Sequence, residues 1–178
     1  MSAGTPESPL DFAGVPDAFQ RLWTPHRMVY IDGENKPADA GEHACPFCRA
    51  PGLPDEQGLV VARGETCFVV LNLYPYNPGH VLVCPTRHVD TMLDLPAELV
   101  VPLFDACRRI AAAMTTALGA QGTFVAVNNV VSQSVPHLHV HVVPRSKGDG
   151  LRGFFWPRTR YAEGELAAYG QVLRDALA

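Results

Sequence analysis

The sequence predicts an α+β fold built on an antiparallel β-sheet. Three observations lead to this class: apolar runs of strand length recur along the chain, one long segment has helical periodicity, and Gly- and Pro-containing turns separate them. With 178 residues, of which 47% are hydrophobic, the chain is expected to form one domain with a sizeable core. Strands gathered around one long helix are typical of the α+β class.

The strand candidates are short runs rich in Val, Leu, Phe and Thr. Gly64 marks a turn after the first run, and the loop YPYNPG precedes the third. The five runs lie at about 59–63, 66–72, 80–85, 123–129 and 137–143.

A long helix is predicted between the third and fourth strands, at about 97–118. Pro96 stands near its start and Gly119 just past its end, as is common at helix boundaries. Apolar residues recur at helical spacing along it: Leu99, Leu103, Ile110, Met114 and Leu118. A short C-terminal helix is predicted at about 163–177, with apolar residues on one face.

The N-terminal residues 1–42 are expected to be a partly mobile extension, with the folded domain at 43–178. The first twenty residues are rich in Pro, Gly and small side chains, and 32–42 has the composition of a loop. No secretory signal or membrane-spanning run is expected.

Charge and cysteine usage narrow the range of partners. The net charge is −4, which argues against nucleic-acid or membrane-surface binding. Cys67, Cys84 and Cys107 lie in apolar runs and are expected to be buried free thiols, which favours a reducing, cytoplasmic location.

Three histidines alternate with apolar residues in SVPHLHVHVVP (134–144). In a strand, alternate side chains share a face, so His137, His139 and His141 point one way and the apolar residues pack on the core. Burying three imidazoles without partners is unfavourable. Imidazole is both a common zinc ligand and a nucleophile or general base near neutral pH, and the rings can take different roles.

The pair Cys45 and Cys48 forms a C-x-x-C motif on a compact loop. This spacing lets two thiolates reach one metal ion, while a redox pair and two plain thiols are the alternatives. A redox motif should open a helix, but the following RAPGLPDEQG is a poor helix former. A tetrahedral site needs two further ligands, and His43 is one candidate among the histidines.

The segment HLHVHVV (137–143) resembles the motif His-φ-His-φ-His-φ-φ of the histidine triad superfamily of nucleotidyl hydrolases and transferases. LNLYPYNPGHVLVCPTRHV (71–89) and NNVVSQSVPHLHVHVVPR (128–145) are similar to its two conserved blocks, and the resemblance covers about 45–160. It implies a five-stranded antiparallel sheet with one long helix, paired into a homodimer.

The resemblance also implies roles in the chemistry. His139 matches the nucleophile that becomes a nucleotidyl-histidine, and His141 and His80 match histidines that contact the phosphates. The expected substrate-binding residues are Asn72, Asn128, Gln133 and Ser134.

The same resemblance implies a metal site. In zinc-containing members the ligands match the two C-x-x-C cysteines, the histidine after the first block and the first triad histidine. These are Cys45, Cys48, His88 and His137. Since all four are protein side chains, the expected zinc is structural.

Two departures concern the acceptor of the nucleotidyl group. Residues 129–132 lack the glycines that hydrolase members often carry before Gln-Ser, and Val140 stands where phosphorylase members tend to have Gln. The front half resembles actinobacterial diadenosine tetraphosphate phosphorylases and the back half resembles histidine triad hydrolases. The expected function is hydrolysis of a dinucleoside polyphosphate. Phosphorolysis or nucleotidyl transfer, and a nucleotide-binding regulator with little turnover, are the alternatives.

Overall fold

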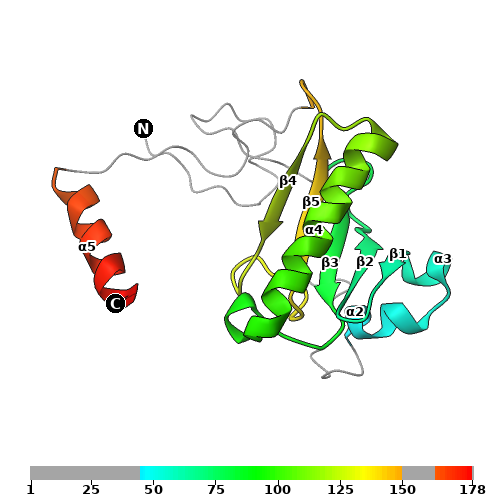
Figure 1. Ribbon diagram of the computed structural model, residues 1–178, viewed down its shortest axis with the longest axis horizontal. Coiled ribbons are helices and arrows are strands. Elements are labelled where there is room, and N and C mark those ends of the chain that lie inside the picture. Colours follow the sequence, from blue (N-terminus) through cyan, green and yellow to red (C-terminus); the bar gives the residue numbers. More distant parts are fainter. Residues whose placement is uncertain (1–44, 150–162, 178) are drawn as a thin grey trace, which may run out of the picture. The chain divides into compact units, whose positions relative to one another are not determined.

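A computed structural model describes residues 45–149 and 163–177 (Figure 1). These residues fall into two compact units: one holds all the strands, and the other holds helix α5 (Glu165–Leu177). Helix α5 confirms the short C-terminal helix expected at about 163–177. The extension 1–42 and its boundary lie outside the described residues, so the expected domain 43–178 stays a prediction.

The strands form one five-stranded sheet in which every neighbouring pair is antiparallel. Its order is β1-β2-β3-β5-β4, so β5 lies between two strands. The strands are β1 (Val60–Arg63), β2 (Cys67–Leu71), β3 (Val81–Pro85), β4 (Gly122–Val127) and β5 (Val140–Arg145). The predicted α+β class and antiparallel sheet are therefore confirmed.

Helix α4 (Ala97–Leu118) lies across one face of the sheet (Figure 1). It begins after Pro96 and ends at Gly119, whose φ of 66° is the left-handed conformation that glycine adopts readily. Leu103, Cys107 and Met114 of α4 are buried in one core cluster with side chains of β2, β3 and β5. The long helix expected from apolar periodicity is therefore confirmed.

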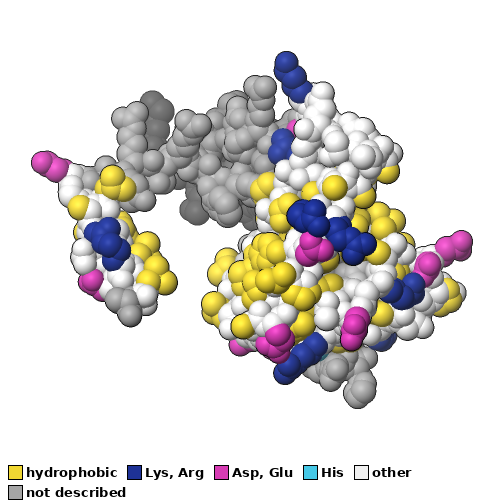
Figure 2. Space-filling view, viewed as in Figure 1, with side chains coloured by type: hydrophobic (Ala, Val, Ile, Leu, Met, Phe, Trp, Pro, Cys, Tyr) yellow, Lys and Arg dark blue, Asp and Glu magenta, His cyan; other side chains and the backbone are white. Residues whose placement is uncertain are grey.

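The outer side of α4 stays exposed and partly apolar. Figure 2 shows hydrophobic side chains over this helix, interrupted by charged ones. Val101 and Phe104 are exposed, whereas Asp105 pairs with Arg108. No helix among the described residues is long and apolar enough to cross a bilayer.

The opposite face of the sheet carries a second core cluster. Strand β2 alternates between the two clusters, since Val69 packs on the α4 side and Phe68 and Val70 on the other. Ala50 and Phe47, from the segment before β1, complete the second cluster. The inner strands β2, β3 and β5 are therefore buried on both faces, and residues of segment 45–59 pack on the face away from α4.

The cysteine segment is more helical than expected. The sequence predicted a compact loop followed by poor helix, but the chain forms α2 (Pro46–Arg49), a 3-10 turn (Ala50–Gly52) and α3 (Asp55–Gly58). Pro46 occupies the first helical position, where a missing N–H has no consequence. Single turns are too short to leave a periodic apolar pattern, and this explains the incorrect prediction.

The strand that carries the histidines begins later than predicted. Strand β5 starts at Val140 rather than at residue 137, because the backbone of Leu138 bonds to Val89 O outside the sheet, at 2.6 Å. Shortly after Val89 the chain forms a short 3-10 turn, Met92–Asp94. The alternation nevertheless holds, since Leu138, Val140 and Val142 are all in the α4-side cluster. The intervening histidines therefore face the other side of the sheet.

Candidate functional site

A cavity of about 370 Å³ lies on the sheet face away from α4. Helices α2 and α3, strand β2 and the loop after it supply most of its wall. Its apolar lining includes Phe47, Leu53, Leu59, Val70 and Leu82. Its polar lining includes Asn72, Ser134, His139 and His141. An apolar pocket with a few convergent polar groups is typical of a small-molecule site.

The expected catalytic histidines His80, His139 and His141 and the expected metal ligand His137 are all buried at this face. His80 and His137 have no exposed surface, and His139 and His141 are 3% and 6% exposed. Buried imidazoles need hydrogen-bond partners, and these partners determine which ring nitrogen carries the proton.

The backbone determines the tautomer of His139. Its Nδ1 lies 2.7 Å from the carbonyl oxygen of His137, which can only accept, so Nδ1–H donates. Nε2 therefore keeps its lone pair in the neutral ring. The Phe47 ring packs edge-on against His139, with ring centres 5.2 Å apart. His139 thus presents an oriented nucleophilic nitrogen in the cavity wall.

A chain of hydrogen bonds assigns the opposite tautomer to His141. The backbone N–H of Tyr76 donates to His80 Nδ1 at 3.1 Å, so the proton of neutral His80 is on Nε2. This Nε2–H donates to His141 Nδ1 at 3.0 Å, which leaves the His141 proton on Nε2. The Tyr76 ring stacks on both imidazoles, at 4.8 and 5.9 Å between ring centres. His141 therefore offers an N–H donor beside the His139 ring, with ring centres 5.1 Å apart.

The expected substrate-binding residues differ in whether they line the cavity. Asn72 lines the cavity; its Oδ1 accepts from the Tyr74 N–H, so its Nδ2 donates to His80 Nδ1 at 3.1 Å. Ser134 also lines the cavity. His80, Asn128 and Gln133 are not among the residues that line it. His80 instead forms a hydrogen bond to His141, which does line the cavity.

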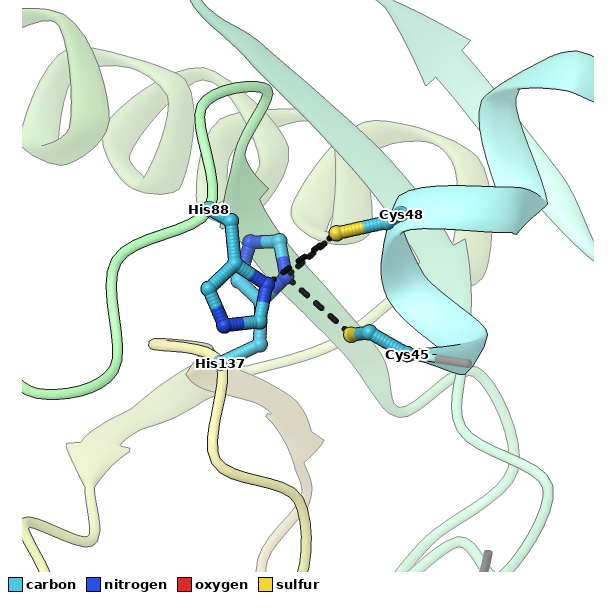
Figure 3. A group of neighbouring side chains, drawn as sticks. All are labelled: Cys45, Cys48, His88 and His137. Atoms are coloured by element: carbon cyan, nitrogen blue, oxygen red, sulfur yellow. Dashed lines mark hydrogen bonds between the residues drawn. The ribbon is translucent and has the colours of Figure 1, made fainter. Parts of the chain in front are cut away.

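Four residues from three parts of the chain form a cluster of potential metal ligands (Figure 3). Their ligand atoms all lie within 4.8 Å of one another; they belong to Cys45, Cys48, His88 and His137. Nδ1 of His137 is 3.4 Å from Cys45 Sγ and 3.5 Å from Cys48 Sγ, and Nδ1 of His88 is 3.1 Å from Cys48 Sγ. Among the described residues, the tetrad expected from the sequence is thus brought together.

The geometry and the protonation state fit a tetrahedral zinc ion. With Zn–S near 2.3 Å and Zn–N near 2.0–2.1 Å, tetrahedral angles put S and N about 3.5 Å apart. His137 Nε2–H donates to Pro85 O at 3.0 Å and His88 Nε2–H to Asp90 Oδ1 at 2.9 Å, so both Nδ1 lone pairs are available. Burial lowers the pKa of His137 to about 4, which keeps it neutral at pH 7. The rival ligand His43 lies outside the described residues.

Within the described residues, the remaining three cysteines belong to no such cluster of potential ligands. Burial raises the pKa of the Cys67 thiol, raises that of Cys84 strongly and raises that of Cys107 to about 11. All five cysteines are free of disulfides. Cys67, Cys84 and Cys107 are thus the buried thiols that the sequence predicted.

Several residues at the site were not identified from the sequence. Tyr76 stacks on the His80–His141 pair, Phe47 lies between Cys45 and Cys48 in the sequence and contacts His139, and Asp90 accepts a hydrogen bond from His88. Their positions within YPYNPGH, CPFC and RHVD were the available signal. A spacing argument cannot show which side chain a neighbouring aromatic ring contacts.

Comparison with known proteins agrees with this arrangement. The HIT domain family matches residues 54–148. A Mycobacterium tuberculosis protein named AP-4-A phosphorylase is 42% identical over 142 residues, covering 76% of this chain and 73% of the relative. A Dictyostelium discoideum bis(5'-adenosyl)-triphosphatase is 37% identical over 95 residues, covering 52% of this chain and 64% of the relative.

The fold is similar to that of a solved structure that contains metal. A Zn-bound histidine triad family protein from Mycobacterium smegmatis superimposes with a TM-score of 0.57 at 31% identity, covering 76% of this chain and 99% of that one. Together, the family match, the identity to relatives and the fold lead to one conclusion. The chain belongs to the HIT domain family.

Proposed function

We propose that this enzyme cleaves the α-phosphate linkage of a dinucleoside polyphosphate, such as diadenosine tetraphosphate, through a nucleotidyl intermediate on His139. One observation carries the proposal: the His137 carbonyl holds the proton of neutral His139 on Nδ1, so the unprotonated ring nitrogen is Nε2, in a residue that lines a pocket of nucleotide-binding size. The relatives named AP-4-A phosphorylase and bis(5'-adenosyl)-triphosphatase support the substrate class.

In the first half-reaction, Nε2 of His139 attacks the α-phosphorus. The P–N bond forms as the P–O bond to the rest of the polyphosphate breaks, and the leaving group of diadenosine tetraphosphate is ATP. The developing charge on the phosphate oxygens is matched by donors at the cavity, namely His141 Nε2–H and the Ser134 hydroxyl. The His137 carbonyl stabilises the imidazolium that His139 becomes.

In the second half-reaction an acceptor attacks the same phosphorus and the P–N bond breaks. With water as acceptor the product is AMP and a proton is released, and His139 returns to its neutral form. Water is the acceptor that we expected from the sequence, and the complete triad supports the intermediate that water would attack. We propose that Asn72, Asn128 and Ser134 bind the nucleotide and that Gln133 orients it indirectly, with the apolar end of the cavity holding the base.

Inorganic phosphate is a second candidate acceptor. The specific observation in its favour is the relative named AP-4-A phosphorylase, which matches 76% of the chain at 42% identity. Val140 provides no contact that could distinguish the acceptors, because its side chain is 1% exposed within the α4-side core. Its effect on the choice is therefore confined to packing beneath the triad.

Product analysis distinguishes the two acceptors. Purified protein incubated with diadenosine tetraphosphate in phosphate-free buffer is expected to release AMP and ATP in equal amounts, since water takes the nucleotidyl group. Chromatography of the same reaction with added phosphate measures any ADP. ADP and ATP formed only when phosphate is present would reject hydrolysis in favour of phosphorolysis.

We further infer that the metal held by Cys45, Cys48, His88 and His137 is zinc and that it is structural. A bound zinc ion would fix the relative positions of α2, the segment after β3 and the triad. The hydrogen bonds from Nε2 of both histidines, which leave Nδ1 of each ring on the side of the cluster, support this assignment. We also propose a cytoplasmic homodimer. The exposed apolar side chains of α4 support the homodimer, because such a surface is suited to an interface. The absence of disulfides among the five cysteines supports the cytoplasmic location.

A further inference from the structure

The loop before the triad holds two residues in a backbone conformation that favours glycine. Val130 and Ser132 have φ values of 66° and 62°. A β-branched residue such as valine is a genuine outlier there, since its Cβ crowds the backbone. The Val130 side chain is 66% exposed, so packing around it does not explain the conformation. Hydrogen bonds within the loop are therefore needed to hold it.

Both polar atoms of the Gln133 carboxamide form hydrogen bonds. Its Oε1 accepts from the Val130 N–H at 2.9 Å, and its Nε2 donates to the Asp90 carbonyl at 2.6 Å. A backbone N–H can only donate and a carbonyl can only accept, so the orientation of the amide is determined. Gln133 thus forms a hydrogen bond to Val130, the β-branched member of the two loop residues with a left-handed backbone conformation.

The second bond ties the loop to the segment that carries the metal ligand His88. Asp90 accepts from Gln133 through its backbone, while its side chain accepts from His88. A further bond runs from the Met92 N–H to Asn129 Oδ1, at 2.9 Å. The loop is therefore anchored on the metal-binding segment at two points, 129 and 133.

The side chain of Gln133 is turned to these partners and not to the cavity. Its neighbour Ser134 lines the cavity with His139 and His141, but Gln133 does not. To reach a phosphate oxygen, the carboxamide would have to leave both bonds. Residues 129–132 lack the glycines that hydrolase members often carry before Gln-Ser, and these two hydrogen bonds hold the turn in their place.

We propose that Gln133 is a positioning residue that holds loop 129–133 in its left-handed shape against the metal-binding segment, and that it affects the nucleotide only through that loop and Ser134. This role explains how a loop with no glycine keeps the turn. It rests on the proposed function only in taking the ligand of the cavity to be a nucleotide.

Glycine substitution in the loop tests this role. Gln133→Ala is expected to weaken AMP binding about tenfold, since two hydrogen bonds that order the loop are lost. Adding Val130→Gly and Ser132→Gly to Gln133→Ala should restore affinity to within about threefold of the wild type, because glycine adopts left-handed φ values without the bonds. Calorimetry with AMP and the full-length chain measures each affinity.

Ser134→Ala is the matched control, since it removes a group from the cavity wall. The same two glycine substitutions should not restore its AMP binding. If they also fail to improve Gln133→Ala, the carboxamide contacts the nucleotide directly and the proposal is overturned.

Hydrogen exchange gives a readout that does not depend on the ligand. The Val130 amide, observed by NMR, should exchange more slowly in the wild type than in Gln133→Ala, whereas Gln121→Ala, which removes a carboxamide bonded to the Lys147 N–H elsewhere, should leave it unchanged. Equal exchange in the wild type and Gln133→Ala would overturn the proposal. A wild type that binds no AMP would reject the proposed function, and the exchange result would still decide the role of Gln133.

Discussion

Replacing His139 with alanine is expected to lower turnover of diadenosine tetraphosphate by at least about a thousandfold. The substitution removes the only nitrogen that the geometry assigns as the nucleophile, and no step through a P–N bond can then occur. Steady-state kinetics with product separation measures the effect. Retained turnover in His139→Ala would contradict the assignment of this residue.

The buried position of His139 requires a control for folding. Its ring packs against Phe47, so alanine leaves a gap in the wall of the cavity. His139→Gln keeps a polar side chain of similar length and should also be inactive. Both variants should retain the circular dichroism spectrum of the wild type. An inactive alanine variant that is unfolded would leave the decision to the glutamine variant.

Replacing Cys45 with serine is expected to remove zinc and to destabilise the fold by more than about 4 kcal/mol. Three chain segments meet at the tetrad, and a metal ion bound there would tie them together. Elemental analysis should find one zinc per wild-type chain, and thermal unfolding should show the lower stability of the variant.

Cys67→Ser is the matched control for the metal site. It makes the same chemical change at a buried cysteine outside the tetrad and should leave the zinc content unchanged. A wild-type protein that is free of metal and equally stable after chelation would refute the metal assignment. The assignment of His139 as nucleophile would be unaffected by that result.

The fold and the face of the triad were predictable because they depend on local periodicity. The alternation of histidines with Leu138, Val140 and Val142 assigns the imidazoles to one face wherever the strand begins. The metal tetrad followed from the resemblance, and the described residues bring its four members within reach of one ion.

The parts that were not predictable depend on contacts between distant segments. The late start of β5 comes from the hydrogen bond between Leu138 N–H and Val89 O. The tautomer of His141 depends on His80, whose own proton is placed on Nε2 because the Tyr76 N–H donates to its Nδ1. Val140 was interpreted from the sequence as a residue that distinguishes acceptors, yet it is buried on the opposite face. The alternation itself was sufficient to predict that position.

The most direct test of the central claim is to locate the covalent intermediate. Protein mixed rapidly with diadenosine tetraphosphate labelled at the α-phosphorus is quenched in base, because a P–N bond is labile in acid, and digested for peptide mass spectrometry. The predicted result is an adenylyl group on His139 in the wild type and none in His139→Ala. Label on another residue, or full turnover with no labelled protein at any mixing time, would contradict a nucleotidyl intermediate on His139.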